Sequence, residues 1–434
     1  MRTEFGVSRR FVMSGHPFSI LCPSLLLLQL SPLYGSELHY TVEYEPRYSS
    51  NITRSATNPM EEYTNVLRLA ARYLESSARL EGSVGIDMEY LSYYSGTFAD
   101  ETRSYANADL SWSLLPERLS WVVEDLLSIE PVLSTQPWTP GNVQQTNLFS
   151  TGPSFDYRLE NHARFHLDLR YMNSYANVTR EFNSNRWSID ASLSQESSIA
   201  SQLSVNMSWN HVGFSNAAAD DYQQLGLYLG WSRQWGRSGL RVELGGTGID
   251  FDREESQYGP HARLTLNRVI SSSKRLTVSL YRGFSDATQQ LRGRPGAASV
   301  QTNIISSQVY TSSEADISYR TEWVNSALDT NLNYQMQEFI NAASQDQRML
   351  TVTSVWNKGF GANVSTDLGL SYSRTEYGQG YRQDETISPF AELYLRRSPH
   401  LSYRLRVEQQ RRDSSVDSSN YTDLMVFATA SYRH

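Results

Sequence analysis

The sequence predicts an all-β protein, a transmembrane antiparallel up-and-down β-barrel of about 20 strands. Three observations support this prediction: a period-two alternation of apolar and polar residues, a high content of interface aromatics, and connections that alternate between short and long. In residues 84–90, for example, Val, Ile, Met and Tyr alternate with Gly, Asp and Glu, and the pattern recurs in 165–171, 203–209 and 401–407. Successive strand side chains point to opposite faces, so each segment has one apolar and one polar face.

The composition favours a membrane barrel. No apolar run approaches the roughly 18 residues that a spanning helix needs, and only 39% of the 434 residues are hydrophobic. Aromatic residues reach 12%, with 27 Tyr and 9 Trp, and these two types gather at membrane interfaces. Because only helices and closed barrels satisfy their backbone in lipid, a membrane location requires a barrel here. A soluble β-sandwich or propeller is the alternative.

The charge pattern bears on possible partners. The formal net charge of −8 argues against a nucleic-acid partner. All but two of the 38 basic residues are Arg, the exceptions being Lys274 and Lys358. Arginines that line a lumen can hold anionic groups, although a genomic codon bias would give the same composition.

The N-terminal region has the organisation of a secretory signal. Arg9 and Arg10 supply positive charge, and an apolar stretch follows at 18–30. This stretch contains Cys22, the only cysteine, so the mature chain would carry no thiol, which suits an oxidising compartment. Cys22 also admits a lipoprotein alternative, which the apolar run beyond the cysteine disfavours. We expect a signal peptide at 1–36 and the barrel at 37–434.

Twenty segments show strand character, and the even number returns the last strand to the side of the first. Omitting the weakest two, 37–45 and 145–158, would give eighteen strands. Short connections such as 116–117 and 272–273 alternate with long ones such as 285–306, which predicts short periplasmic turns and long extracellular loops. The predicted strands are 37–45, 63–74, 79–92, 103–115, 118–128, 145–158, 163–173, 182–194, 200–212, 222–233, 238–251, 260–271, 274–284, 307–324, 328–340, 347–357, 361–376, 385–396, 400–410 and 421–434.

The last segment is similar to the closing strand of bacterial outer-membrane proteins. Leu424, Val426, Ala428 and Ala430 share one apolar parity, and an aromatic residue, Tyr432, stands third from the end. Such strands usually finish in Phe, whereas the last residue here is His434.

Charged residues of both signs fall on the parity that we expect to face the lumen. They could set the field of an aqueous channel, or form a cross-strand ion network that fills the lumen. His166 and Asp168 could also orient an imidazole for base catalysis, but no G-x-S-x-G motif accompanies them. The histidines show no metal-ligand spacing, so we predict no catalytic residue, metal or cofactor. The lumen candidates are Asp87, Glu89, Arg164, His166, Asp168, Arg170, Arg320, Glu322, Arg404, Arg406 and Glu408.

Two long loops, 129–144 and 285–306, carry features beyond ordinary turn residues. The second contains Arg292 and Arg294, which could attract an anionic polymer if the loop folds inward as a constriction. The alternative for both loops is plain exposure to solvent.

Residues 114–123, 147–153 and the pair Arg170-Tyr171 show a more specific similarity. They resemble a family of proteobacterial outer-membrane barrels that are encoded with exopolysaccharide and exosortase (PEP-CTERM) loci. The resemblance implies an outer-membrane location and a link to polysaccharide export. It supplies no catalytic residues.

Together these features favour a non-enzymatic outer-membrane barrel of porin type, serving exopolysaccharide passage or surface attachment. The expected partners are outer-membrane lipid, lipopolysaccharide and a polysaccharide. Two alternatives remain: an outer-membrane enzyme of lipase or protease type, and a structural or adhesive barrel whose lumen is plugged.

Overall fold

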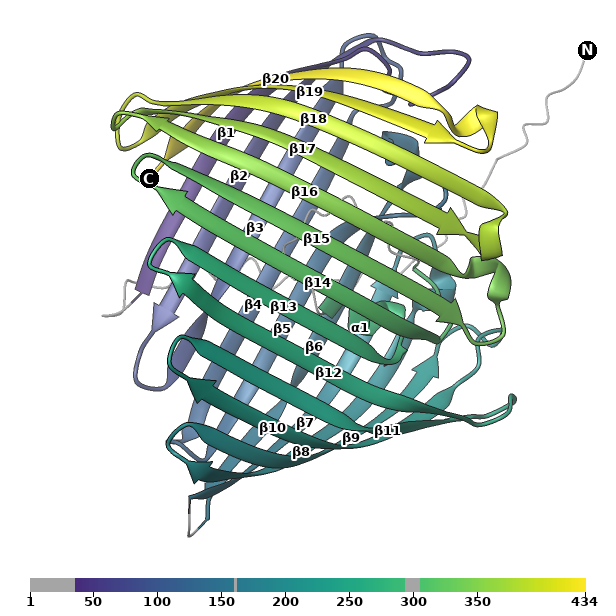
Figure 1. The fold of residues 1–434 in the computed structure, drawn as a ribbon. Helices are drawn as coiled ribbons and strands as arrows, with labels where there is room; N and C mark the ends of the chain where they lie inside the picture. Colours follow the sequence, from purple (N-terminus) through teal and green to yellow (C-terminus); the bar gives the residue numbers. More distant parts are fainter. Residues whose placement is uncertain (1–35, 160–161, 293–304) are drawn as a thin grey trace, which may run out of the picture.

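The chain forms one closed β-barrel in a computed structural model that describes residues 36–159, 162–292 and 305–434 (Figure 1). Each strand pairs antiparallel with the next, and β1 pairs with β20 to close the ring. The first ten strands are β1 (Ser36–Ser49), β2 (Glu62–Ser76), β3 (Leu80–Tyr93), β4 (Glu101–Leu115), β5 (Leu119–Pro131), β6 (Val143–Arg158), β7 (Ala163–Ala176), β8 (Ser184–Ser198), β9 (Ser201–Phe214) and β10 (Tyr222–Trp235). The others are β11 (Ser238–Phe251), β12 (Gln257–Ser271), β13 (Lys274–Ser285), β14 (Tyr310–Trp323), β15 (Ser326–Phe339), β16 (Gln347–Phe360), β17 (Val364–Tyr377), β18 (Arg382–Arg396), β19 (Leu401–Ser414) and β20 (Tyr421–Arg433).

The predicted strand number of twenty is confirmed, and the alternative of eighteen is wrong. The two weakest segments are the true strands β1 and β6, since each pairs with both of its neighbours. The expected signal peptide at 1–36, with Cys22, lies outside the described residues apart from Ser36, which begins β1.

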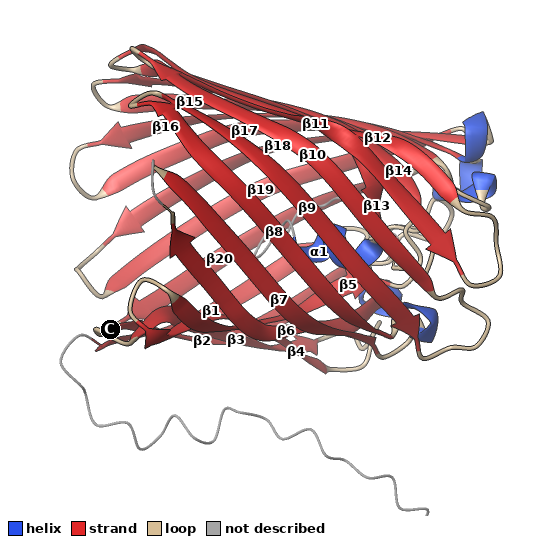
Figure 2. Cartoon of the chain, turned by 90° about the horizontal axis from the view of Figure 1, so that it is seen from below, coloured by secondary structure: helices blue, strands red, loops and turns tan. Residues whose placement is uncertain are grey.

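The two ends of the barrel differ in the length of their connections, as predicted. Figure 2 shows compact turns at one end, and long loops with short helical turns at the other. Several strands continue further toward the long-loop end than predicted: β1 reaches Ser49 and β19 reaches Ser414. The reason is that both faces become polar there, so the apolar alternation ends while backbone pairing continues. Short turns mark the periplasmic end of such barrels.

The outer surface carries an exposed apolar belt. Leu67, Leu69 and Val205, in the middle of their strands, are each at least 44% exposed, which is what a lipid-facing surface requires. Exposed aromatic residues flank the belt at both ends, as interfacial girdles do. Those near the short turns include Trp112, Trp121, Trp235 and Trp323, and those near the long loops include Tyr63, Tyr90, Tyr175 and Trp187.

One short helix, α1 (Ala287–Arg292), lies inside the ring of strands (Figures 1 and 2). It follows β13 directly and packs against the wall formed by β5 to β8. Within the described residues, no helix is long and apolar enough to cross a membrane.

Candidate functional site

The inner wall of the barrel is the candidate site, and its charged side chains form ion pairs between neighbouring strands. Arg68 on β2 contacts Asp87 at 2.9 Å and Glu89 at 2.8 Å, both on β3, and Glu43 on β1 at 3.5 Å. Arg404 on β19 reaches Glu43 from the other side at 3.9 Å. The predicted residues Asp87, Glu89 and Arg404 therefore belong to one network that crosses the closing seam.

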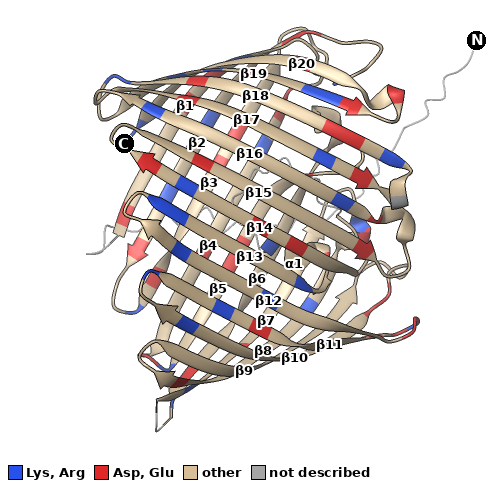
Figure 3. Cartoon of the chain, viewed as in Figure 1, with Lys and Arg blue, Asp and Glu red and all other residues tan. Residues whose placement is uncertain are grey.

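Further ion pairs lie beside this network on β18 and β19. Arg406 contacts Glu408 at 2.7 Å and Glu392 at 3.5 Å, and its guanidinium lies 3.8 Å from the centre of the Phe390 ring. The predicted residues Arg406 and Glu408 thus pair with each other, and Arg406 also contacts residues of the neighbouring strand. Figure 3 shows charges of both signs distributed along the strands of the barrel.

A second group of predicted residues lies on β6 and β7. His166 is held between two carboxylates: Nδ1 lies 3.1 Å from Asp156 and Nε2 lies 3.1 Å from Asp168. Because both ring nitrogens are engaged, neither is free to activate a nucleophile. Arg164 pairs with Asp156 at 2.5 Å, so this group is an ion network rather than a catalytic arrangement.

Arg170 has a structural position in the same group. The ladder between β6 and β7 is interrupted at Gly152 and Pro153, where a Cβ on Gly152 would lie 2.0 Å from the carbonyl oxygen of Leu169. Buried Arg170 donates to the Pro153 carbonyl at 2.8 Å and pairs with Asp168 at 3.0 Å. Gly152 therefore lets β6 and β7 approach closely, and Arg170 satisfies the backbone carbonyl of Pro153 where the ladder is interrupted.

The remaining predicted pair is separate from both groups. Arg320 and Glu322 lie near the short-turn end of β14, 2.7 Å apart, and Arg320 also contacts Asp329 on β15 at 2.9 Å. All three side chains are partly exposed. The predicted lumen residues therefore lie in three separate groups: at the closing seam and the adjacent strands β18 and β19, on β6 and β7, and on β14.

The segment Asp286–Arg292 lies inside the barrel and is anchored by a buried ion pair. Asp286 pairs with Arg186 on β8 and accepts a hydrogen bond from Tyr222 on β10. The Arg186 and Asp286 side chains are only 3% and 6% exposed. Burial raises the pKa of Asp286, but the Arg186 guanidinium and the Tyr222 hydroxyl outweigh it and hold that pKa below its ordinary value.

Apolar contacts complete the docking of α1. Ala287 and Leu291 pack with Leu148, Ala176 and Phe182 in one buried cluster on the β6 to β8 side of the wall. Arg292, a predicted candidate to attract an anionic polymer, pairs with Glu124 on β5 at 2.9 Å. Arg294 lies outside the described residues.

Beside α1 lies a cavity of about 1100 Å³. At the short-turn end its lining includes His39, Arg72 and Arg433, and at the long-loop end it includes Arg54 and Trp138. The cavity therefore reaches from one end of the barrel to the other. Leu291 of α1 also lines it. Seven lining residues are Arg and four are Asp or Glu, so its wall carries charges of both signs with a basic excess.

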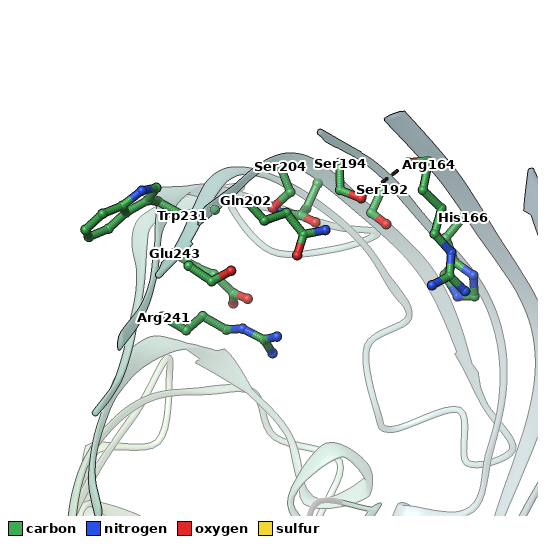
Figure 4. A pocket seen from close by; sticks show the side chains of 12 residues that line it. Arg164, His166, Ser192, Ser194, Gln202, Ser204, Trp231, Arg241 and Glu243 are labelled. Carbon is green, nitrogen blue, oxygen red and sulfur yellow. Dashed lines mark hydrogen bonds between the residues drawn. The ribbon is translucent and has the colours of Figure 1, made fainter. Parts of the chain in front are cut away.

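A smaller cavity of about 340 Å³ lies on the opposite wall, formed by β7 to β11 near the short turns. Figure 4 shows Arg164 and His166 on one side of it and Arg241 and Glu243 on the other, with serines between them. Among the described residues no group of three or more His, Cys, Asp or Glu is placed to hold a metal.

The anchor of α1 is the feature that sequence reasoning missed. In the sequence, Arg186 occupies a lumen-facing position of its strand like many other polar residues, and Asp286 resembles an ordinary turn residue at the end of β13. The two are 100 residues apart, so nothing in the local pattern connects them.

No protein-family model and no curated protein matches the sequence. Among solved structures, the chain is similar to the FrpB iron transporter from Neisseria meningitidis (F5-1 variant), with a TM-score of 0.53 and 7% identity over 91% of this chain and 82% of that one. It is also similar to OccK2 (OpdF) from Pseudomonas aeruginosa, with a TM-score of 0.41 and 12% identity over 92% and 97%. At such identities the first likeness shows the fold alone. Together with the exposed apolar belt, this fold places the protein in the outer membrane of a Gram-negative bacterium.

Proposed function

We propose that the barrel is a porin-type channel that passes hydrophilic solutes along the cavity beside α1. The observation that supports it is the extent of that cavity, whose lining includes residues near both ends of the barrel. Its wall is polar and charged, which suits a solute that leaves bulk water. The docked segment Asp286–Arg292 narrows the lumen on one side and leaves this passage on the other.

The solute class that we propose is a polysaccharide or its acidic building blocks. The resemblance of residues 114–123 and 147–153 to barrels encoded with exopolysaccharide loci supports this, as does the excess of Arg over acidic side chains along the passage. Surface attachment of a polysaccharide is the alternative role for the same wall.

Site-directed labelling in planar bilayers tests the channel. Ala70 lines the cavity, whereas its neighbour Leu69 is 51% exposed on the outer belt. The only cysteine of the sequence is Cys22, so a new thiol in the barrel has no competitor. We expect wild-type conductance, and a fall in current when Ala70→Cys is modified by a bulky anionic thiol reagent.

Leu69→Cys is the matched control, and its current should stay unchanged under the same reagent. A folded wild type without conductance would support the plugged structural or adhesive barrel instead. Lipid or peptide hydrolysis by the purified protein would support the enzyme alternative, against which the fully engaged imidazole of His166 counts.

A further inference from the structure

Polar side chains gather on the lumenal face where the β19–β20 hairpin meets the long loops. Arg412 on β19 lies directly opposite Tyr421 on β20, and Gln410 lies opposite Asp423. Gln410, Arg412 and Tyr421 all line the cavity of about 1100 Å³. The position is at the extracellular entrance of the proposed passage.

Several polar atoms of this group are buried without a hydrogen-bond partner among the described residues. They are Nε and Nη1 of Arg412, the hydroxyl of Tyr421 and Oε1 of Gln410. Of these, Nη1 of Arg412 lies 3.6 Å from Asp384, close enough for an ion pair but not for a hydrogen bond. Gln410 and Tyr421 are only 6% and 5% exposed. Since buried polar groups in proteins are nearly always hydrogen-bonded, such a concentration of unpartnered groups requires an explanation.

The nearby carboxylates are already engaged. Asp384 accepts two hydrogen bonds from Arg382, at 2.8 Å and 2.7 Å, and lies 3.6 Å from Arg412. Asp423 accepts from the Ser49 hydroxyl at 2.7 Å and from the Asn51 backbone N–H at 3.0 Å.

A third cation completes the group. The guanidinium of Arg54 lies 5.6 Å from the centre of the Tyr421 ring, and that of Arg412 lies 5.3 Å from it. Arg54 forms no salt bridge with any residue in the described part of the chain. The three guanidinium groups of Arg54, Arg382 and Arg412 therefore outnumber the two carboxylates of this group, Asp384 and Asp423, which already have partners.

We propose that Arg412, Tyr421, Arg54 and Gln410 form a binding subsite for a hydroxylated oxyanion, the chemistry of an acidic sugar. The guanidinium groups and the phenol hydroxyl donate to the oxyanion, and Oε1 of Gln410 accepts from a sugar hydroxyl. Arginine suits this role because it stays charged and presents donors in a fixed plane. The inference rests on the proposed function only in that the solute reaches the subsite through the passage.

Calorimetric titration of the full barrel in detergent micelles tests the subsite without relying on conductance. The probes are galacturonate, neutral galactose and inorganic sulfate. We expect galacturonate to bind more tightly than galactose, and Arg412→Gln to weaken that binding at least about tenfold. Tyr421→Phe, which removes a single hydroxyl, should weaken it several-fold. Asp384 keeps both bonds from Arg382 in the Arg412 variant, so folding should be preserved.

Arg411→Gln is the matched control, because its side chain is 60% exposed and pairs with Asp413 at 3.1 Å. Equal binding of sulfate and galacturonate would support an oxyanion site but contradict recognition of the sugar, and the site would then bind small anions in general. No binding of galacturonate by the folded protein, equal binding of galactose, or unchanged binding by Arg412→Gln would overturn the subsite. Binding without conductance refutes the channel alone, and conductance without binding refutes the subsite alone.

Discussion

Asp286 is the single residue on which the position of α1 depends most. Removing one partner of a buried ion pair costs about 3–5 kcal/mol when the other charge stays buried. In Asp286→Ala the segment should therefore leave its docked position rather than keep Arg186 dry and unpaired. We expect faster proteolysis next to α1 and a higher conductance, while the strands stay intact.

The control for this variant is Asp413→Ala. Asp413 and Arg411 are both about 60% exposed, and such surface pairs contribute only about 0–1 kcal/mol. Protease sensitivity and conductance should match the wild type. If Asp286→Ala behaved in the same way as this control, the anchoring role of Asp286 would be wrong.

The pKa of Asp286 also predicts how the docked segment responds to pH. This carboxyl has a pKa below the ordinary 3.8, mainly because Arg186 and Tyr222 outweigh the effect of burial. A lowered pKa contributes stability that is present above the unfolded value and is lost as the pH falls through the folded value. Conductance should therefore stay constant from pH 7 to about pH 5 and rise at more acidic pH, below the ordinary carboxyl pKa. A rise at neutral pH would contradict this assignment.

At the scale of a strand, β19 offers a direct comparison of the two faces of the wall. Leu405 is 48% exposed on the outer belt, and its neighbour Arg404 faces the lumen with a weak contact of 3.9 Å to Glu43. Arg at a lipid-facing position near the bilayer midplane costs about 2–4 kcal/mol. Leu405→Arg should show this loss in reversible folding into lipid vesicles. Arg404→Leu should lose about 0–1 kcal/mol, and equal losses would reverse the assignment of the two faces.

The same alternation explains which elements were predictable. Parity predicts the strands of the barrel, with β1 and β6 the weakest, since a lipid-facing surface must be apolar on alternate residues. It does not predict strand ends beyond the membrane, so β19 continues to Ser414 while the prediction stops at 410. Nor does it predict α1, because six residues are too few to show a helical period.

The candidate site on the inner wall was also predictable only in part. Parity placed Asp87 and Arg406 on the lumenal face, but it does not specify which strand supplies the partner. Arg68, which joins Asp87 and Glu89, and the pairing of Arg186 with Asp286 depend on register and on a loop that folds inward. Such contacts between distant residues require the closed barrel.

For the whole molecule, closure depends on the seam between β1 and β20. Its ladder omits Glu45 and Pro46, the second of which has no N–H to donate. A side chain bridges the seam at this gap, where the Thr429 hydroxyl donates to Glu45 at 2.5 Å, and another bridges it nearer the long loops, where Ser49 donates to Asp423 at 2.7 Å. The seam is thus held by side chains where backbone pairing is weakest.

His434 contributes to the seam at its short-turn end, where Phe is the residue usually found. Its backbone exchanges hydrogen bonds with Tyr40 at 2.9 Å and 3.1 Å, and its ring stacks on Tyr40 with centroids 5.0 Å apart. Aromatic pairs of this kind contribute about 0.5–1.5 kcal/mol beyond their buried area. His434→Ala keeps the backbone bonds and removes the ring, so it should lower the stability of the closed barrel by about that amount.

His434→Phe keeps a ring for Tyr40 and should restore the stability of the barrel. The measurement is the temperature at which the barrel loses the fast gel mobility of its compact, folded form. A phenylalanine variant as unstable as the alanine variant would show that the ring contact does not hold the seam.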